Sequence, residues 1–283
     1  MKFSKSIIEI IQSRSSWRTY VPQSLEDELK KRIHQTFQIK KNNPFGGPVR
    51  FELIEMPELD PNERNQLGTY GFIKGAQYFI VAAMQQSKYD LENLGYRLEE
   101  IILRATDLGL GTCWLGGTFK RSAFGAKINV TADEIVPAAT PIGHTTLDRS
   151  LREKIIRWAV KARHRLPWHS LFFEDDFNQP LSKDKAGKYA IPLEMVRLSP
   201  SASNKQPWRV LKEVESHNYH FFILRKGRNV ISRYDFPRID LGIAICHFNL
   251  TVQELSLTGK WNFTPLDTSF PDLEYLISWS SES

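Results

Sequence analysis

A run of small hydroxyl and amide side chains at residues 199–208 is well suited to hold a polar ligand. The run reads SPSASNKQPW. Its hydroxyl and amide side chains, with the backbone N–H groups of a tight turn, supply donors and acceptors for a flat polar molecule. Pro207 biases Gln206 toward an extended conformation, so a strand is expected to begin near Trp208. A surface loop that binds nothing has a similar composition, and the run alone leaves both interpretations open.

A second group of residues, near the N-terminus, suits an anion. Arg14-Ser15-Ser16-Trp17-Arg18 places two hydroxyl groups between two guanidinium groups. Phosphate esters are bound by donors of both kinds. A solvated helix end has the same composition. A basic stretch then runs from Arg149 to Arg165, and its last members, Arg163 and Arg165, follow an expected helix, from where they could reach an anion.

Glycines cluster at residues 109–117, which read GLGTCWLGG. Glycine allows the backbone to approach a flat ligand closely. The spacing is not that of a phosphate-binding loop, because no Gly-Lys-Ser/Thr follows and GxGxxG is absent. A helix that ends at Gly109 or Gly111 and continues into a strand explains the glycines without a ligand. The sequence contains no GxSxG, HExxH or kinase motif and no Cys/His ligand spacing, so we expect none of these catalytic centres and no metal site.

Composition limits the class of protein. The 283 residues are 41% hydrophobic and 25% charged, enough for one large domain or two ordinary ones. The net charge of +6 is too diffuse to predict a nucleic-acid partner, and RNA binding through residues 149–165 ranks last among the alternatives. Cys113 and Cys246 are far apart, and no stretch reads as a signal peptide or a membrane span. These features predict a cytoplasmic protein with no membrane association.

Hydrophobic periodicity predicts an α+β fold. The expected helices cover residues 4–13, 24–37, 91–108, 193–196 and 240–257, and the expected strands 49–56, 78–83, 135–142, 209–214 and 219–224. Residues 170–188 are acidic and polar, with Pro180 and Gly187, and read as a connection over the surface. We expect a mainly antiparallel sheet flanked by helices, occurring twice.

The two halves of the sequence match each other at an offset of 147 residues. This offset places Leu94-Gly95 on Leu241-Gly242, Leu103 on Leu250 and Trp114 on Trp261. Two amphipathic helices share leucine spacing by chance quite often. The glycine and the tryptophan fall in the same frame, however, which favours an internal duplication. We therefore expect two related halves, residues 1–170 and 171–283, packed as a pseudo-symmetric pair.

Taken in order, these segments resemble the FMN-dependent nitroreductase family, and in particular its TM-type branch. Residues 199–208 resemble the family's Pro-Ser-x-x-Asn-x-Gln-Pro-Trp signature, with every fixed position present. Residues 14–18 resemble the Arg-Arg-Ser-x-Arg signature, with Ser15 in place of the second arginine. Residues 109–117 resemble the helix end and strand that face the flavin, and residues 163–167 resemble the basic pair before Leu-Pro.

The motifs are divided between the halves in an unusual way. The first half has the arginine motif, but residues 42–47 replace the Asn-x-Gln-Pro-Trp motif, and the second half shows the reverse. The resemblance therefore implies a fused, monomeric pseudo-dimer with one complete FMN site between its halves. Any second FMN site would be incomplete.

The resemblance also implies which residues bind the cofactor. Arg14, Ser15, Ser16 and Arg18, with Arg163 and Arg165, would hold the FMN phosphate and ribityl chain. Pro200 begins the loop whose residues Ser201, Ala202, Ser203 and Asn204 would line the isoalloxazine edge. Leu115, Gly116 and Gly117 would lie near the flavin N5 and offer backbone N–H groups.

The implied activity is a ping-pong reaction in which NADH or NADPH reduces FMN and a small-molecule acceptor, such as a nitroaromatic compound or a quinone, then takes the electrons. Arg18 is the candidate for stabilising negative charge on the reduced ring. Two alternatives stay open: a flavin-binding protein without catalysis, and a specialised flavin reductase or dehalogenase on the same scaffold.

Overall fold

The computed structural model describes the chain in ranges that together form two compact units. These ranges are residues 2–39, 43–56, 73–117, 119–146, 153–155, 158, 161, 164–225, 234–264 and 270–282. Unit 1 comprises Met1–Lys5 and Ser13–Ala162, and unit 2 comprises Ser6–Gln12 and Arg163–Ser283. The roles expected of residues 1–170 and 171–283 stay predictions.

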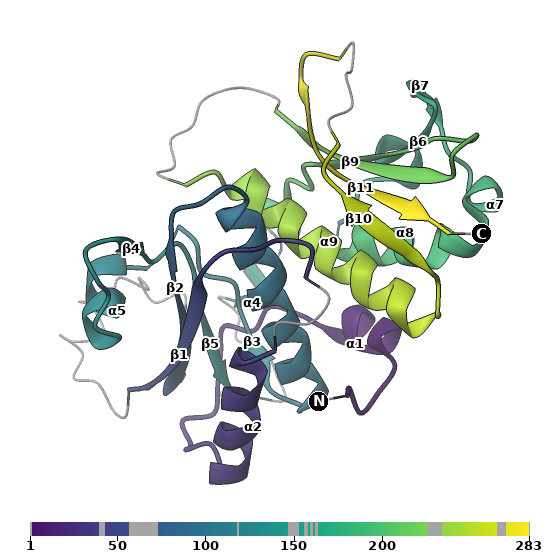
Figure 1. Cartoon of the computed structure of the whole chain (residues 1–283). Coiled ribbons are helices and arrows are strands. Elements are labelled where there is room, and N and C mark those ends of the chain that lie inside the picture. The colour runs from purple at the N-terminus through teal and green to yellow at the C-terminus, as the bar shows by residue number, and fades with distance from the viewer. Residues whose placement is uncertain are drawn as a thin grey trace. The chain divides into compact units, whose positions relative to one another are not determined.

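Unit 1 is built on an antiparallel sheet. Its strands are β1 (Val49–Glu55), β2 (Tyr78–Gln85), β3 (Gly111–Thr112), β4 (Glu134–Ile135) and β5 (Ala139–Gly143). Within the described part of unit 1 the order is β1-β2-β5-β3, and β4 pairs with β2. The helices are α2 (Asp27–Phe37), α4 (Asp90–Asp107) and α5 (Arg121–Lys127), and α4 packs against β1, β2 and β3 (Figure 1).

The core of unit 1 is formed around a strand and a helix that are buried on all sides. Every residue of β2 from Tyr78 to Met84 is buried, in agreement with the continuous apolar run. Phe79 of β2 packs edge-on against Phe124 of α5, and Phe119 packs in the same way on Phe124. The central helix α4 is buried from Asp90 to Ala105, so its charged side chains must find partners inside the unit.

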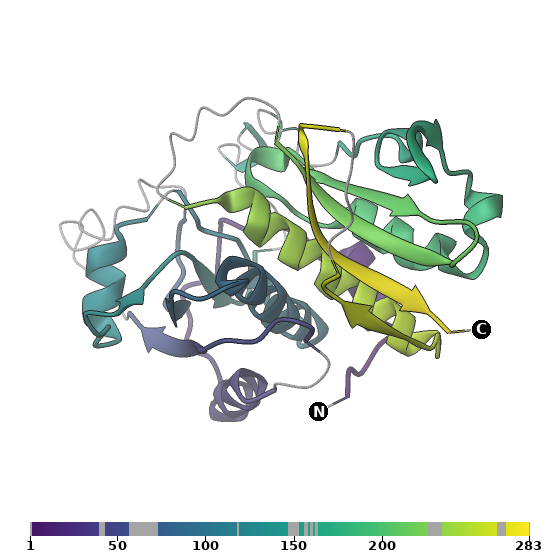
Figure 2. The same cartoon turned by 45° about the horizontal axis from the view of Figure 1, so that its top comes forward.

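Unit 2 is built on a larger sheet. Its strands are β6 (Phe172–Glu174), β7 (Asp176–Pro180), β8 (Trp208–Lys212), β9 (Asn218–Leu224), β10 (Gly259–Asn262) and β11 (Leu273–Ser281), in the order β10-β11-β9-β8-β6-β7 for the described residues. Its helices are α1 (Ile7–Ser13), α7 (Lys183–Ala186), α8 (Ala190–Leu198) and α9 (Phe236–Glu254), with 3-10 turns at Trp168–Ser170, Gly187–Tyr189 and Ala202–Asn204. α9 packs against α8 and against β8 and β9 (Figure 2).

The two units share one topology. The order β1-β2-β5-β3 in unit 1 corresponds to β8-β9-β11-β10 in unit 2, and every one of these pairs is antiparallel. In each unit a long helix, α4 or α9, follows the second strand of the series. The 147-residue offset places Asp107, the last residue of α4, on Glu254, the last residue of α9. The expected α+β fold with two related halves is confirmed.

The prediction for residues 170–188 is wrong. These residues form β6, β7 and the short helix α7 instead of a surface connection. Leu171, Phe172 and Leu181 are buried, and β6 pairs in parallel with β8, so a few apolar side chains fix a segment that is otherwise rich in polar residues. The charge of Glu174 is matched by an ion pair with Lys185. The parallel pairing joins segments more than thirty residues apart, so the local composition does not reveal it.

None of the helices in the described ranges combines the length and the apolar character that a membrane crossing needs.

An aromatic cluster in unit 2 generates a prediction about stability. Phe248 of α9 is fully buried, and its ring lies against the rings of Tyr189, Tyr219, Phe221, Trp261 and Trp279. We expect Phe248→Ala to lower the free energy of unfolding by about 3–5 kcal/mol, because a large cavity would remain. Urea unfolding followed by circular dichroism measures the change. Ile191→Ala is the control, since Ile191 is 45% exposed. A loss no larger than that of this control would contradict the prediction.

Candidate functional site

In unit 1 the arginine motif and the glycine-rich segment lie side by side. Ser16 forms a parallel bridge with Thr112, and the Trp17 N–H donates to the Thr112 carbonyl at 2.8 Å. Gly111 permits this approach, because a Cβ there would lie 3.1 Å from Cγ of Trp17 and 2.1 Å from a methyl group of Thr145. The two segments that the sequence singled out separately therefore form one backbone arrangement.

Arg14 is anchored to the central helix of its unit. Its Nε lies 3.6 Å from Oε1 of Glu99, and the two side chains are 7% and 0% exposed. The other oxygen of Glu99 accepts a hydrogen bond of 2.6 Å from the indole N–H of Trp114. A buried carboxylate needs such partners to remain charged. Glu99 thus holds residues from both segments against the same part of α4.

Arg18 has unused hydrogen-bonding capacity. Its Nη1 is buried and has no hydrogen-bond partner among the described residues, and the same holds for Nε of Arg14. Burial raises the pKa of the Cys113 thiol, while the charge of Arg18 and the hydroxyl of Ser16 oppose that shift. The Cys113 thiol is therefore neutral and not a nucleophile. Two guanidinium groups that each have a buried N–H without an acceptor among the described residues favour a partner that accepts hydrogen bonds.

Of the three residues expected to offer backbone N–H groups to a ligand, Leu115 already uses its N–H within the unit. The N–H of Leu115 donates to the Ala139 carbonyl at 2.9 Å, and the Ala139 N–H donates back at 3.0 Å. The Gly116 carbonyl accepts a hydrogen bond from Arg121. No hydrogen bond is found for the N–H of Gly116 or Gly117 among the described residues. These two amides are the ones left for a ligand.

In unit 2 the loop from Pro200 to Gln206 has an unusual backbone. Ser203, Asn204 and Gln206 have φ values of 51°, 55° and 50°, so the extended conformation expected for Gln206 before Pro207 is wrong. Side chains other than glycine rarely adopt this left-handed region, and surrounding contacts must hold them there. The Gln206 N–H donates to Oγ of Ser201 at 2.9 Å, which closes the loop on itself.

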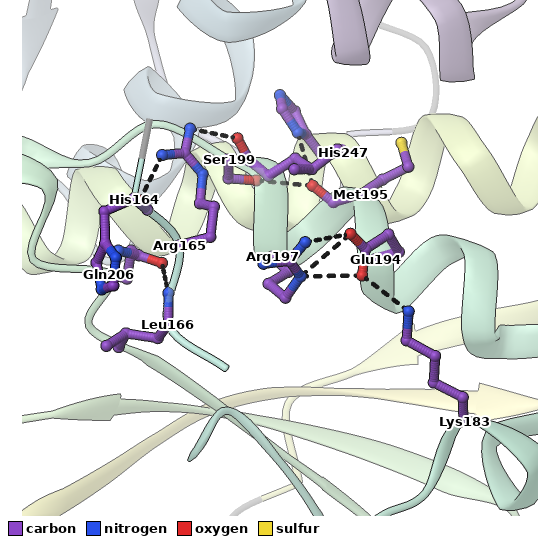
Figure 3. A network of polar contacts seen from close by, with 11 residues as sticks. His164, Arg165, Leu166, Lys183, Glu194, Met195, Arg197, Ser199, Gln206 and His247 are labelled. Carbon is purple, nitrogen blue, oxygen red and sulfur yellow. Dashed lines mark hydrogen bonds and ion pairs between the residues drawn. The ribbon is translucent and has the colours of Figure 1, made fainter. Parts of the chain in front are cut away.

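A second set of contacts ties this loop to residues 164–166 (Figure 3). Arg165 donates through Nη1 to Oδ1 of Asn204 at 3.3 Å and through Nη2 to the Leu198 carbonyl at 3.1 Å. The Leu166 N–H donates to Oε1 of Gln206 at 2.8 Å. Arg165 and Asn204, both predicted as binding residues, are therefore in contact. Arg163 lies outside the described residues.

Asp240 of α9 holds the same loop from the other side. Its carboxyl is 4% exposed, and Oδ1 accepts the Ala202 N–H at 2.9 Å. Burial raises the pKa of Asp240 to about 8, although the Ala202 N–H and the charge of Lys205 act in the opposite direction. The sequence reasoning missed this residue, because no local pattern links it to a turn so far away along the chain. It also passed over Gln206, although Gln206 occupies a fixed position of the motif.

In the described ranges, no group of three or more His, Cys, Asp or Glu side chains has the arrangement of a metal site.

The raised pKa of Asp240 predicts a pH dependence of stability. Between the ordinary value of 3.8 and about 8, the folded protein keeps a proton that the unfolded chain releases. The free energy of unfolding therefore falls as the pH rises through this window. Asp240→Asn keeps an acceptor for the Ala202 N–H and removes the titration. We expect the stability of this variant relative to wild type to increase steadily with pH, as measured by urea unfolding.

The outcome that contradicts this prediction is a flat pH profile. An effect of Asp240→Asn on stability that does not change between pH 3.8 and about 8 would refute the buried, protonated carboxyl.

Comparisons with known proteins agree with the motifs. The family model described as "Putative TM nitroreductase" matches residues 6–252. A protein described as a putative nitroreductase from Thermotoga maritima MSB8 aligns over 99% of this chain and 96% of its own length, with 19% identity and a TM-score of 0.59, which shows the same fold. No curated protein matches the chain.

Shorter solved structures align with part of the chain. An FMN-dependent nitroreductase from Clostridium difficile R20291 covers 50% of this chain and 90% of its own, with 18% identity and a TM-score of 0.40. A nitroreductase family protein from Clostridium novyi NT covers 52% of this chain and 87% of its own, with 22% identity and a TM-score of 0.40. The family assignment depends on the family model, which matches residues 6–252. On that match, this chain belongs to the TM nitroreductase family and is an oxidoreductase of the nitroreductase type.

Proposed function

We propose that the chain binds FMN and uses NADH or NADPH to reduce a small organic acceptor, such as a nitroaromatic compound or a quinone. The observation that supports this best is a pair of buried guanidinium nitrogens, Nε of Arg14 and Nη1 of Arg18, which have no hydrogen-bond acceptor among the described residues. A phosphate monoester would supply acceptors for both and negative charge beside Arg18, since Glu99 already pairs with Arg14.

The residues around these arginines fit the polar end of FMN. Ser15 and Ser16 are half-buried between the two arginines and bring hydroxyl groups that suit phosphate and ribityl oxygens. The Arg14 ion pair with Glu99 fixes one guanidinium, and the Ser16–Thr112 bridge fixes the backbone beside the other. We assign phosphate and ribityl binding to Arg14, Ser15, Ser16 and Arg18. The parts expected of Arg163 and Arg165 at the phosphate stay predictions.

A second group of residues fits the edge of a flat ring. The loop from Pro200 to Asn204 presents hydroxyl, amide and backbone groups in a conformation that Asp240 and Arg165 hold. The N–H groups of Gly116 and Gly117 add two donors without a hydrogen bond among the described residues. We propose that Pro200, Ser201, Ala202, Ser203 and Asn204 line the isoalloxazine edge and that Gly116 and Gly117 bind near N5. The part expected of Leu115 stays a prediction, because its N–H is already used and its side chain lies in the core of unit 1.

When bound, FMN supplies the hydride chemistry, and the protein positions the ring and adjusts its electronics. Arg18 would provide the positive charge that favours a reduced, anionic ring. The two glycine amides would orient the ring by hydrogen bonds. We propose no side chain as a general acid or base.

This proposal predicts that the purified chain, after reconstitution, is yellow and holds about one FMN per chain. Arg18→Ala should weaken FMN binding roughly tenfold or more, because a charge-assisted hydrogen bond is lost. Quenching of flavin fluorescence on titration measures the affinity. Arg197→Ala is the matched control, since Arg197 pairs with Glu194 in α8 and belongs to neither group. A chain that retains no flavin would overturn the proposal.

Turnover is a separate prediction. We expect FMN-loaded protein to oxidise NADH or NADPH in the presence of nitrofurazone or menadione, with the parallel-line kinetics of a ping-pong reaction. Absorbance at the nicotinamide band follows the rate. Flavin binding without turnover would instead identify a non-catalytic flavoprotein, and turnover of a halogenated substrate alone would identify a dehalogenase.

A further inference from the structure

We propose that unit 1 contains a second ligand site, separate from the residues assigned to FMN, that binds a small organic anion through Arg97. The site is a pocket of about 550 Å³ lined by residues of the 43–50 segment, of β2 and of α4, together with Glu134. All of its lining residues belong to unit 1. The inference therefore does not depend on the proposed flavin chemistry.

Arg97 supplies the positive charge of the pocket. It is 6% exposed, and its only hydrogen bond among the described residues is from Nη2 to the Phe37 carbonyl at 2.9 Å. The ring of Phe51 lies 5.7 Å from its Cζ. Burial lowers the pKa of this guanidinium, as expected for a cation taken out of water. One carbonyl and one ring leave most of its five N–H donors unfilled.

The nearby carboxylates are already committed to other arginines. Glu100 raises the pKa of Arg97, but it forms its ion pair with Arg104 at 2.8 Å. Glu134, at the pocket wall, accepts from Nε and Nη2 of Arg50 at 2.7 and 2.8 Å. This pairing lowers the pKa of Glu134 to about 2, and the two charges cancel. No carboxylate of the described residues lies within 4.0 Å of Arg97, so no ion pair occupies its N–H donors.

The loop at the pocket wall is rigid enough to form a site. Asn93 lies one helical turn before Arg97 and faces the same side of α4. Its Nδ2 donates to the Gly47 carbonyl at 3.1 Å, and its Oδ1 accepts from Nδ2 of Asn43 at 2.6 Å. Gly47 has φ of +109° and would place a Cβ 2.8 Å from Oγ of Ser87, so the turn requires glycine. The Asn93 amide thus hydrogen-bonds to Asn43 and to Gly47, and these two bonds fix the turn to α4.

The loop also offers backbone donors. Gly46 and Gly47 line the pocket, and their N–H groups have no hydrogen bond among the described residues. A guanidinium group with adjacent amide N–H groups is the donor set that binds carboxylate and phosphate oxygens. Phe45, Val49 and Ala83 add apolar wall, which favours an organic anion over an inorganic one. The ligand class is therefore a small molecule that has a carboxylate or phosphate group and an apolar body.

The test uses the full chain and isothermal titration calorimetry with two probes, benzoate and phenyl phosphate. We expect saturable binding of one ligand per chain at millimolar concentrations or below for at least one probe. Binding of benzoate alone would identify a carboxylate ligand, and binding of phenyl phosphate alone would identify a phosphate ligand. No saturable binding of either probe would overturn the inference.

Two variants locate the binding in this pocket. Arg97→Gln removes the charge and is expected to weaken binding roughly tenfold or more. Gly46→Leu adds a bulky side chain at the pocket wall without a clash, since a Cβ on Gly46 meets no atom within 4 Å and the residue does not have a left-handed φ. If Arg97→Gln does not fold, Gly46→Leu alone tests whether the probe binds in this pocket. Arg225→Gln in unit 2 is the matched control for charge, because Arg225 pairs with Asp235 and Glu274 outside the pocket.

FMN binding is measured on the same proteins. Gly46→Leu should abolish binding of the anion and leave FMN affinity unchanged. Probe binding that survives Gly46→Leu would place the anion elsewhere and overturn the assignment. A chain that binds a probe but no FMN would refute the proposed flavin function and leave the anion site standing.

Discussion

The buried charge of Glu99 is the constraint on which the candidate site of unit 1 depends. Glu99 is fully buried in the middle of α4, and its two oxygens face Arg14 and the Trp114 indole. An unpaired carboxylate in this position would cost several kcal/mol, so folding of the helix brings in both partners. The arginine motif and the strand after α4 are thereby fixed to one turn of one helix, and the Ser16–Thr112 bridge completes their alignment.

In both units the long helix also anchors the loop that precedes the first strand of the series, through a different residue in each unit. The 147-residue offset relates Asn93 of α4 to Asp240 of α9. Asn93 holds the loop before β1 through the Gly47 carbonyl, and Asp240 holds the loop before β8 through the Ala202 N–H. One position in the duplicated helix therefore anchors the loop before the first strand of the series in both units. The loops have different sequences, but the origin of their rigidity is the same.

Much of this arrangement could be predicted from the sequence. Periodicity located the central helices, the dense apolar strand β2 and the duplication, because these depend on local spacing. It failed for residues 170–188, where Phe172 and Leu181 fix strands that local composition does not indicate. The motifs identified the Ser201–Asn204 loop and Arg165. They did not identify Glu99, Arg97 or Asp240, because each acts through a partner that only the folded chain brings close.

The electrostatic difference between the two anchored loops explains why they need not bind the same ligand. The position that corresponds to Arg97 is Ala244 in unit 2, which is fully buried and uncharged. Burial raises the pKa of Asp240 to about 8, so the carboxyl that holds the loop of unit 2 ionises less readily than an ordinary aspartate. The positive charge at that loop comes from Arg165, which donates to Asn204. In unit 1 the positive charge comes instead from the helix itself, through Arg97. The two loops therefore differ in where their charge lies, while the sheet and the anchoring position stay the same.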